Sequence, residues 1–88
     1  MLDHTNHSQA DRVLNIVIDI IEKHSIDKQI MVDDDLRAAG LTSIDIVSLM
    51  LTVEAEFDLT IPESAMTIHN FRSVTSIDTL VSGIRAIG

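Results

Sequence analysis

Apolar residues recur at intervals of three and four along three stretches of this chain, and this spacing limits its fold more than any other feature. Such intervals place apolar side chains on one face of a helix, and no stretch shows the alternation typical of a half-buried strand. The 88 residues include no cysteine, so one small domain must be held by an aliphatic core, with Phe57 and Phe71 as the only aromatic residues. We therefore predict an all-α fold.

The spacing predicts a bundle of four helices, three longer and one short. The first runs from about residue 9 to 24. At its start, Ser8 is followed three residues later by Asp11, which is capping-box spacing. The second begins within residues 40–45 and ends at 57 or 58. A short third helix, roughly 62–69, has Pro62 in its first turn, and the last helix begins near Ser73.

Two segments lack a sustained period. Residues 1–7 are expected to form a mobile tail, which leaves residues 8–88 as the folded domain. Residues 25–41 are expected to form a long connecting loop, a feature that is often functional in a small domain. We expect its apolar residues to tie it to the core: Ile26, Ile30, Met31, Val32 and Leu36.

Two adjacent hydroxyl residues open the second helix. Thr42 has an acidic residue, Asp45, three positions later, which is the spacing of a capping box, so Thr42 is predicted to be the N-cap. Ser43 then occupies the first helical position. Its hydroxyl is not needed for capping.

The second helix carries more apolar surface than a bundle core requires. One side of it can fill the core, with Ile46, Leu49, Met50, Val53 and Phe57. Ile44, Val47 and Leu51 widen the apolar arc to roughly 220°, well beyond the ~100° stripe of an ordinary surface helix. Either the 25–41 loop and the third helix cover these three residues, or the three form a docking surface.

Acidic residues are concentrated in the middle of the chain. Residues 33–63 hold eight aspartates and glutamates against one basic residue, Arg37, and so carry −7 of the total charge of −8. Such a surface repels nucleic acid and anionic membranes, and it attracts basic protein surfaces. Simple solubility explains the charge equally well. The N-terminus has no signal-peptide pattern and no apolar run approaches ~20 residues, so we expect a cytoplasmic protein. We also expect a monomer.

Catalytic and metal-binding patterns are weak. A serine at a helix start can act as a nucleophile only with a base nearby, and the four histidines fall in the tail or at helix ends: His4, His7, His24 and His69. The residues around Ser43 also lack the second glycine of a G-x-S-x-G elbow. The aspartates at 33–35 depart from a calcium loop, because Arg37 and Ala38 stand where a ligand and a glycine belong. We predict neither an enzyme nor a metal site.

The run DDDLRAAGLTSIDIVSLMLTVEAEFDLTIPESAM resembles the acyl carrier proteins and peptidyl carrier domains. The match includes a Gly-Leu-x-Ser-(Ile/Leu)-Asp start to the second helix and Glu-x-x-Phe at Glu54 and Phe57. It continues with Ile61 and Pro62 and a closing amphipathic helix, and it covers roughly residues 10–85.

The resemblance implies that a phosphopantetheinyl transferase attaches 4′-phosphopantetheine from coenzyme A to Ser43. The arm would then hold an acyl or aminoacyl group as a thioester and present it to partner enzymes. By the same resemblance, the residues expected to contact partners are Leu41, Thr42, Ile44, Asp45, Val47, Leu51 and Glu54. The partners implied are a loading ligase or transferase and downstream biosynthetic enzymes with basic docking surfaces.

Some positions depart from the fatty-acid carriers. Those usually have aspartate before the serine, where this chain has Thr42, and glutamate where it has Ser48 and Ala55. Charges at the rim of an interface mainly set encounter rate and partner choice. We therefore expect a discrete carrier for a specialised pathway, with a polyketide, a nonribosomal peptide, a modified lipid or a single amino acid as cargo. The alternative is a small acidic interaction module without a prosthetic group.

Overall fold

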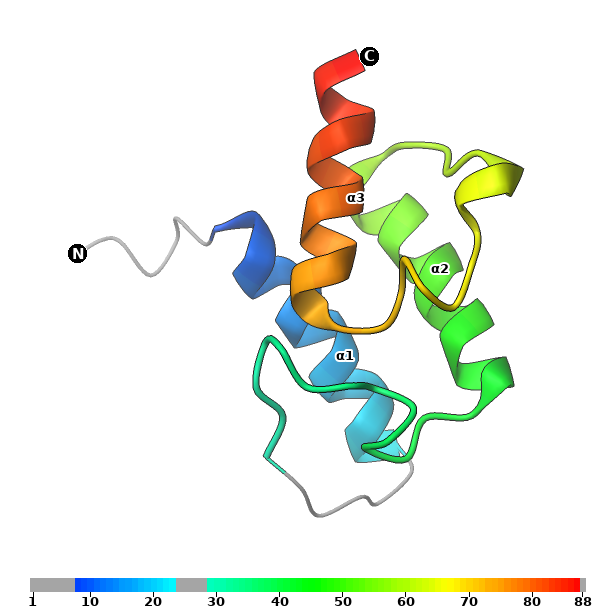
Figure 1. Ribbon diagram of the computed structural model, residues 1–88. Helices are drawn as coiled ribbons and strands as arrows, with labels where there is room; N and C mark the ends of the chain where they lie inside the picture. The colour runs from blue at the N-terminus through cyan, green and yellow to red at the C-terminus, as the bar shows by residue number, and fades with distance from the viewer. Residues whose placement is uncertain (1–7, 24–28, 88) are drawn as a thin grey trace, which may run out of the picture.

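The computed structural model describes residues 8–23 and 29–87, and these residues form an all-helical domain (Figure 1). The α-helices are α1, Gln9–Lys23; α2, Ser43–Phe57; and α3, Val74–Ile87. A short 3-10 helix, η2, spans Glu63–Ala65. No strand occurs in the described ranges, which confirms the predicted all-α class, and none of their helices could cross a bilayer. The expected tail at residues 1–7 lies outside them.

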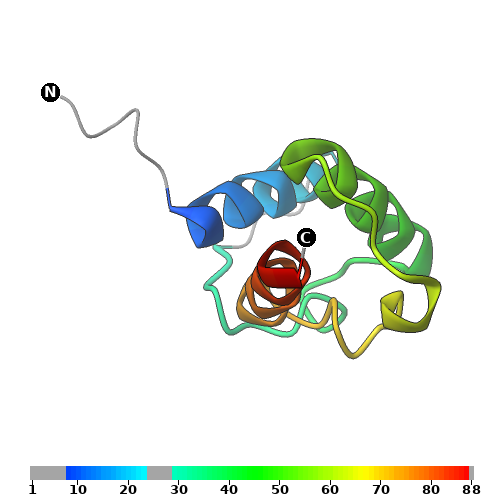
Figure 2. The same ribbon diagram turned by 90° about the horizontal axis from the view of Figure 1, so that it is seen from above.

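Helix α1 packs against both α2 and α3 (Figures 1 and 2). The apolar stripes of the three helices face one another, and the loops add side chains to the same cluster. Because the stripes of α2 and α3 are both buried against α1 and against the loop side chains, the hydrophobic effect holds the bundle together. The buried apolar residues are Val13, Ile16, Val17, Ile20, Ile21, Ile30, Leu36, Ala39, Leu41, Ile46, Leu49, Met50, Val53, Phe57, Ile61, Phe71, Val74, Ile77 and Val81.

Hydrogen bonds close both ends of α2. At the start, the Thr42 hydroxyl accepts from the Asp45 N–H at 3.2 Å, and the Asp45 carboxylate accepts from the Thr42 N–H at 2.8 Å. This reciprocal pair is the predicted capping box. At the end, Asp58 adopts a left-handed conformation (φ 51°) and its N–H donates to the Glu54 carbonyl. The Glu54 carboxylate also accepts from the Ile61 N–H at 2.7 Å.

The prediction of a short third helix at 62–69 is wrong about its length. Pro62 precedes a single 3-10 turn, and the chain then leaves helical geometry. Continuing the helix would require the Ala65 carbonyl to accept from an N–H four residues on. That carbonyl instead accepts from the Asn70 side-chain amide at 2.9 Å and from the Thr67 N–H at 2.9 Å. The described residues therefore hold three α-helices and this short turn.

The long loop before α2 is fixed to α3. The Thr75 N–H donates to the Val32 carbonyl at 2.9 Å, and the Leu36 N–H donates to the Arg72 carbonyl at 2.8 Å. Leu36 is fully buried, as predicted.

Two apolar residues of this loop contradict the prediction that they pack on the core. Met31 and Val32 are exposed, because the Met31 N–H turns back to the Asp34 carboxylate while the Val32 carbonyl faces α3. Ile30 is buried as predicted, and the expected contact of Ile26 lies outside the described residues.

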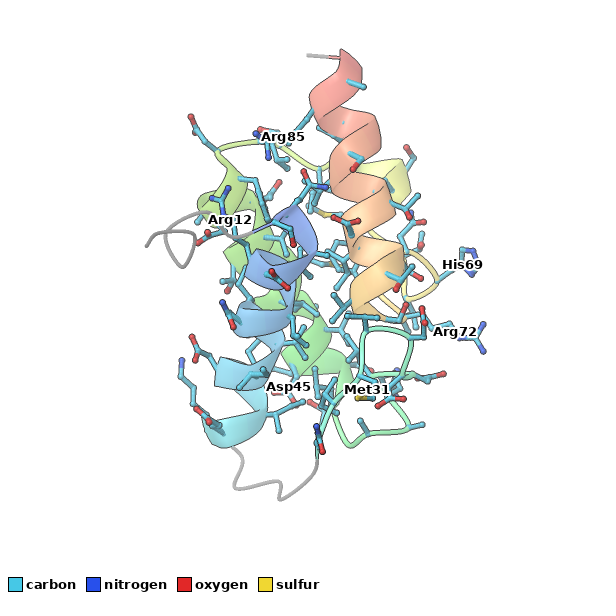
Figure 3. The ribbon with its side chains drawn as sticks, turned by 90° about the vertical axis from the view of Figure 1, so that its left-hand side faces the viewer. Arg12, Met31, Asp45, His69, Arg72 and Arg85 are labelled. Atoms are coloured by element: carbon cyan, nitrogen blue, oxygen red, sulfur yellow. The ribbon has the colours of Figure 1, made fainter. Side chains whose placement is uncertain are left out.

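The end of α2 remote from Ser43 is cross-linked by arginines. Arg12 of α1 pairs with Glu56 at 2.8 Å and lies over the Phe57 ring at 4.5 Å. Arg85 of α3 lies over the same ring at 5.8 Å. These cation–π contacts join the three helices at one end of the bundle (Figure 3).

We predict that Thr42→Ala destabilises the protein by about 1 kcal/mol through loss of the cap. For a domain of this size, that corresponds to a melting temperature lower by about 4–8 °C, measured by circular dichroism. Thr42→Ser keeps the hydroxyl and should melt near the wild type. Thr60→Ala, at an exposed position outside the helices, is the control; an equal loss there would contradict the capping role.

A second prediction concerns how stability depends on pH through residues 29–42, the described part of the loop before α2, called the 29–42 loop. The Ala38 N–H lowers the pKa of the Asp35 carboxyl below its ordinary value of 3.8, and the Arg37 N–H and Arg72 act in the same direction. Because the folded-state pKa is the lower one, the stabilisation is complete above about 3.8 and disappears as pH falls through the folded value. Urea unfolding should show that Asp35→Asn costs stability at pH near 6 and much less at pH near 3.

The control for this measurement is Asn15→Ala, at an exposed position of α1 with no titratable side chain. Its difference from the wild type should stay constant between the two pH values. A pH-independent cost of Asp35→Asn would contradict the prediction.

Candidate functional site

Ser43 is the first residue of α2, and its surroundings leave its side chain free. Gly40 has φ 119°, a conformation that glycine adopts without strain, and it turns the chain toward the helix. Leu41 then anchors the turn in the core and Thr42 caps the helix. Ser43 follows as an exposed residue, as predicted for the first helical position. No hydrogen bond to another described residue fixes its hydroxyl.

The start of α2 favours an anion attached to Ser43. The capping box satisfies the Asp45 N–H, whereas the N–H groups of Ser43 and Ile44 donate to no other group among the described residues. Exposed amides at the positive end of a helix dipole stabilise negative charge. A phosphodiester on the exposed hydroxyl would lie beside these two donors. The residues present therefore fit a phosphopantetheine group.

The described part of the chain provides Ser43 with no base in hydrogen-bond contact. The nearby Asp45 carboxylate is held by the Thr42 N–H and hydroxyl. His69 is the one histidine within the described ranges, and Figure 3 shows its ring pointing away from the body of the molecule.

Three large apolar side chains next to Ser43 are exposed. Ile44, Val47 and Leu51 are 78%, 53% and 58% exposed. We call these three residues the apolar face of α2. Neither the 29–42 loop nor η2 covers them, so the structure resolves the two alternatives that the sequence left open in favour of exposure. The five residues of α2 predicted for the core are buried: Ile46, Leu49, Met50, Val53 and Phe57.

Three of the predicted partner contacts have structural roles instead of open surface. Leu41 is 2% exposed and Asp45 is 7% exposed, because one fills the core and the other completes the capping box. Glu54 is half-buried and holds the Ile61 N–H. Thr42 is exposed, but its hydroxyl is engaged with Asp45. We therefore restrict the candidate docking surface to the apolar face of α2.

One feature of the site was not predicted from the sequence. A shallow pocket of about 370 Å³ lies between α1 and α2, lined by Ile20, Lys23, Asp45, Ser48, Leu51 and Thr52. The available signal was the pair of polar residues at 48 and 52, which share one face of α2. Only the packing of α1 shows that this face borders a pocket.

The aspartates at 33–35 accept hydrogen bonds that hold the 29–42 loop in place. Asp33 accepts from the Thr75 hydroxyl, Asp34 from the Met31 N–H, and Asp35 from the N–H groups of Arg37 and Ala38. Across the residues that the structure describes, no group of three or more acidic or histidine side chains is arranged to hold a metal ion.

Comparison with known proteins agrees with this geometry. The model of the family described as phosphopantetheine attachment site matches residues 11–78. Aminoacyl carrier protein 1 of Bradyrhizobium diazoefficiens is 41% identical over 76 residues, which cover 86% of this chain and 84% of the relative. Aminoacyl carrier protein 2 of the same organism is 38% identical over 71 residues, with coverages of 81% and 80%.

Solved structures give the same result. One similar chain is in the crystal structure of Bradyrhizobium japonicum glycine:[carrier protein] ligase complexed with cognate carrier protein and an analogue of glycyl adenylate. Its TM-score is 0.77 and its identity 35%, with 85% of this chain and 96% of that chain covered. A second, from the ligase complexed with glycylated carrier protein, has a TM-score of 0.75, 35% identity and coverages of 82% and 96%. The chain therefore belongs to the family of carrier proteins that bear a phosphopantetheine attachment site.

Proposed function

We propose that this protein is an aminoacyl carrier, modified on Ser43 by a phosphopantetheinyl transferase with coenzyme A as donor. The observation that carries the proposal is the exposed Ser43 hydroxyl at the start of α2, released from capping by Thr42 and flanked by two open amides. The names of the similar proteins support amino acids as the cargo. The departures from fatty-acid carriers at Thr42, Ser48 and Ala55 agree with this choice.

The protein's own residues have three tasks in this function. Thr42 and Asp45 fix the helix start, Ser43 provides the point of attachment, and the N–H groups of Ser43 and Ile44 favour the phosphodiester charge. When attached, the arm supplies a terminal thiol that holds the amino acid as a thioester. We infer that the chain has no catalytic activity of its own, since the arm carries the reactive atom and partners carry the catalytic groups.

The partner supported best is an amino acid ligase that loads the arm. Chains similar to this one occur in complexes with a glycine:[carrier protein] ligase. We propose that the apolar face of α2 contacts the ligase and that the acidic charge of residues 33–63 favours a basic partner surface. Downstream enzymes that accept the amino acid would use the same face. The cytoplasmic location and the monomeric state stay predictions.

Incubation with coenzyme A and a broad-specificity transferase should increase the intact mass by one phosphopantetheinyl group. Ser43→Ala should abolish the increase, because the point of attachment is removed. Ser48→Ala, which removes another exposed hydroxyl of the same helix, is the matched control and should be modified normally. An increase that persists in Ser43→Ala would exclude this site, and no increase in the wild type would favour the interaction module without a prosthetic group.

The same mass measurement identifies the cargo. Protein purified from its native cell should contain a fraction heavier than the phosphopantetheinylated form by one aminoacyl group. Mild hydroxylamine should remove this extra mass, because thioesters react with it. A fatty acyl increment would contradict the aminoacyl cargo while leaving the carrier function intact.

Leu51→Glu should lower kcat/KM for loading by roughly ten- to hundredfold. Burial of a leucine side chain in an interface contributes about 1.5–3 kcal/mol, and each 1.4 kcal/mol corresponds to a factor of ten. The measurement uses phosphopantetheinylated variants with the Bradyrhizobium japonicum ligase, glycine and ATP. Since Leu51 is 58% exposed, the melting temperature should not change.

Met31→Glu is the matched control for this experiment. It introduces the same charge at an exposed apolar residue of the 29–42 loop, away from the apolar face of α2. Loading of this variant should stay near the wild-type rate. Equal losses in the two variants would show that charge alone, and not the apolar face, determines docking.

A further inference from the structure

The exposed side of α2 carries no charge. Helix α2 lies at the edge of the bundle (Figure 2), and its exposed residues from the start of the helix to Ala55 are all uncharged. At about 100° per residue they fall within about 180° of the helix circumference, and they span about 18 Å along the axis. We call them the uncharged strip of α2, which includes the apolar face: Ser43, Ile44, Val47, Ser48, Leu51, Thr52 and Ala55.

The carboxylates of α2 are all engaged within the carrier itself. Asp45 is 7% exposed and completes the capping box. Glu54 is half-buried and accepts from the Ile61 N–H at 2.7 Å. Glu56 forms an ion pair with an arginine of α1 at 2.8 Å. A partner that covers the strip therefore meets no carboxylate of α2 that lacks a bond of its own.

We propose that the partner surface that docks on α2 is apolar and uncharged where it covers the strip, and that its basic residues lie outside this contact. The inference rests on the proposed function, because it describes how the loading ligase fits the carrier. A partner cation buried against the strip would lose its hydration without gaining a carboxylate, which is costly. An apolar partner side chain gains free energy from burial at the same place.

The positive group that borders the strip also disfavours a basic contact. Lys23 of α1 lines the shallow pocket together with Leu51 and Thr52. It is exposed, and no ion pair to another described residue neutralises it. Asp45 lies in the same lining, but its carboxylate accepts from Thr42. The ammonium group therefore repels a partner cation that approaches this side of the strip.

The acidic residues of the carrier then act from outside the contact. Residues 33–63 carry a charge of −7, which attracts a basic partner over distances of about 10 Å. Charges at such distances mainly raise the rate of encounter, whereas the groups in contact decide which partner stays bound. The strip thus determines specificity. An enzyme that lines its site for α2 with arginine or lysine is attracted to the carrier but rejected on contact.

The experiment replaces Val47, in the apolar face of α2, by glutamate, lysine and glutamine in separate variants. Each variant is phosphopantetheinylated on Ser43 and loaded by the Bradyrhizobium japonicum ligase with glycine and ATP. Val47→Gln loses the apolar side chain without adding a charge and is the reference. Both Val47→Glu and Val47→Lys should have a kcat/KM at least roughly tenfold below this reference, because either charge is buried without a partner. The loss should appear in the KM for the carrier, since docking is affected.

The sign of the effect distinguishes the two kinds of partner surface. A basic surface predicts that Val47→Glu is loaded faster than Val47→Gln and that Val47→Lys is loaded more slowly. A faster rate with either charge would overturn the inference. Equal rates in the three variants would also overturn it, because the strip would then lie outside the contact.

The matched controls are the same three residues placed at Thr79, an exposed β-branched position of α3. They measure the long-range effect of the same charges. Differences among the Thr79 variants should be small and should vanish at high ionic strength, where charges outside a contact are screened. Differences at Val47 should persist, and their loss at high ionic strength would contradict a buried contact.

The melting temperatures of the three Val47 variants should agree, since Val47 is 53% exposed. If a charge at Val47 lowers the melting temperature, the same substitutions at Ala55, at the other end of the strip, repeat the test with the same expected result. Loading of the wild type separates the two proposals. A ligase that does not load the wild type refutes the proposed partner and this inference together, whereas a wild type that is loaded and a charged variant that is loaded faster refute this inference alone.

Discussion

Two hydrogen bonds exchanged between Thr42 and Asp45 determine where α2 begins, and the site depends on them. Because the Thr42 hydroxyl accepts from the Asp45 N–H, Ser43 lies in the first turn, and no described residue bonds to its hydroxyl. Burial of its apolar stripe against α1 and the loops sets the rotation of α2 about its axis. That rotation places Ile46, Leu49 and Val53 in the core, and the same geometry necessarily turns the apolar face of α2 to solvent.

Residue spacing predicted the elements whose formation is local. The capping box, the first helical position of Ser43 and the division of α2 into core and exposed sides follow from intervals of three and four residues, which a single helix determines by itself. The boundaries of α1 and α2 agree with the prediction within a residue or two. Exposure of the apolar face could not be decided in this way, because it depends on where the loops pass.

The features that the sequence did not predict depend on contacts outside the helical intervals of three and four residues. The turn at η2 ends because Asn70 takes the carbonyl of Ala65, five residues earlier. Val32 is exposed while α3 binds its carbonyl through Thr75, 43 residues further along the chain. The pocket requires α1 to lie against α2. No local pattern in the chain encodes these three arrangements.

The capping contacts at both ends of α2 fix the length of this helix. Between the Thr42–Asp45 pair and the left-handed Asp58 there are 15 helical residues, or about 22 Å. An enzyme that contacts both ends of α2 would be sensitive to the distance between them as well as to the exposed side chains. Inserting one residue would move the far contact by about 1.5 Å and rotate it by about 100°. A change in the number of residues of α2 would therefore move its two ends relative to each other, whereas the exchange of one exposed side chain for another would leave them in place.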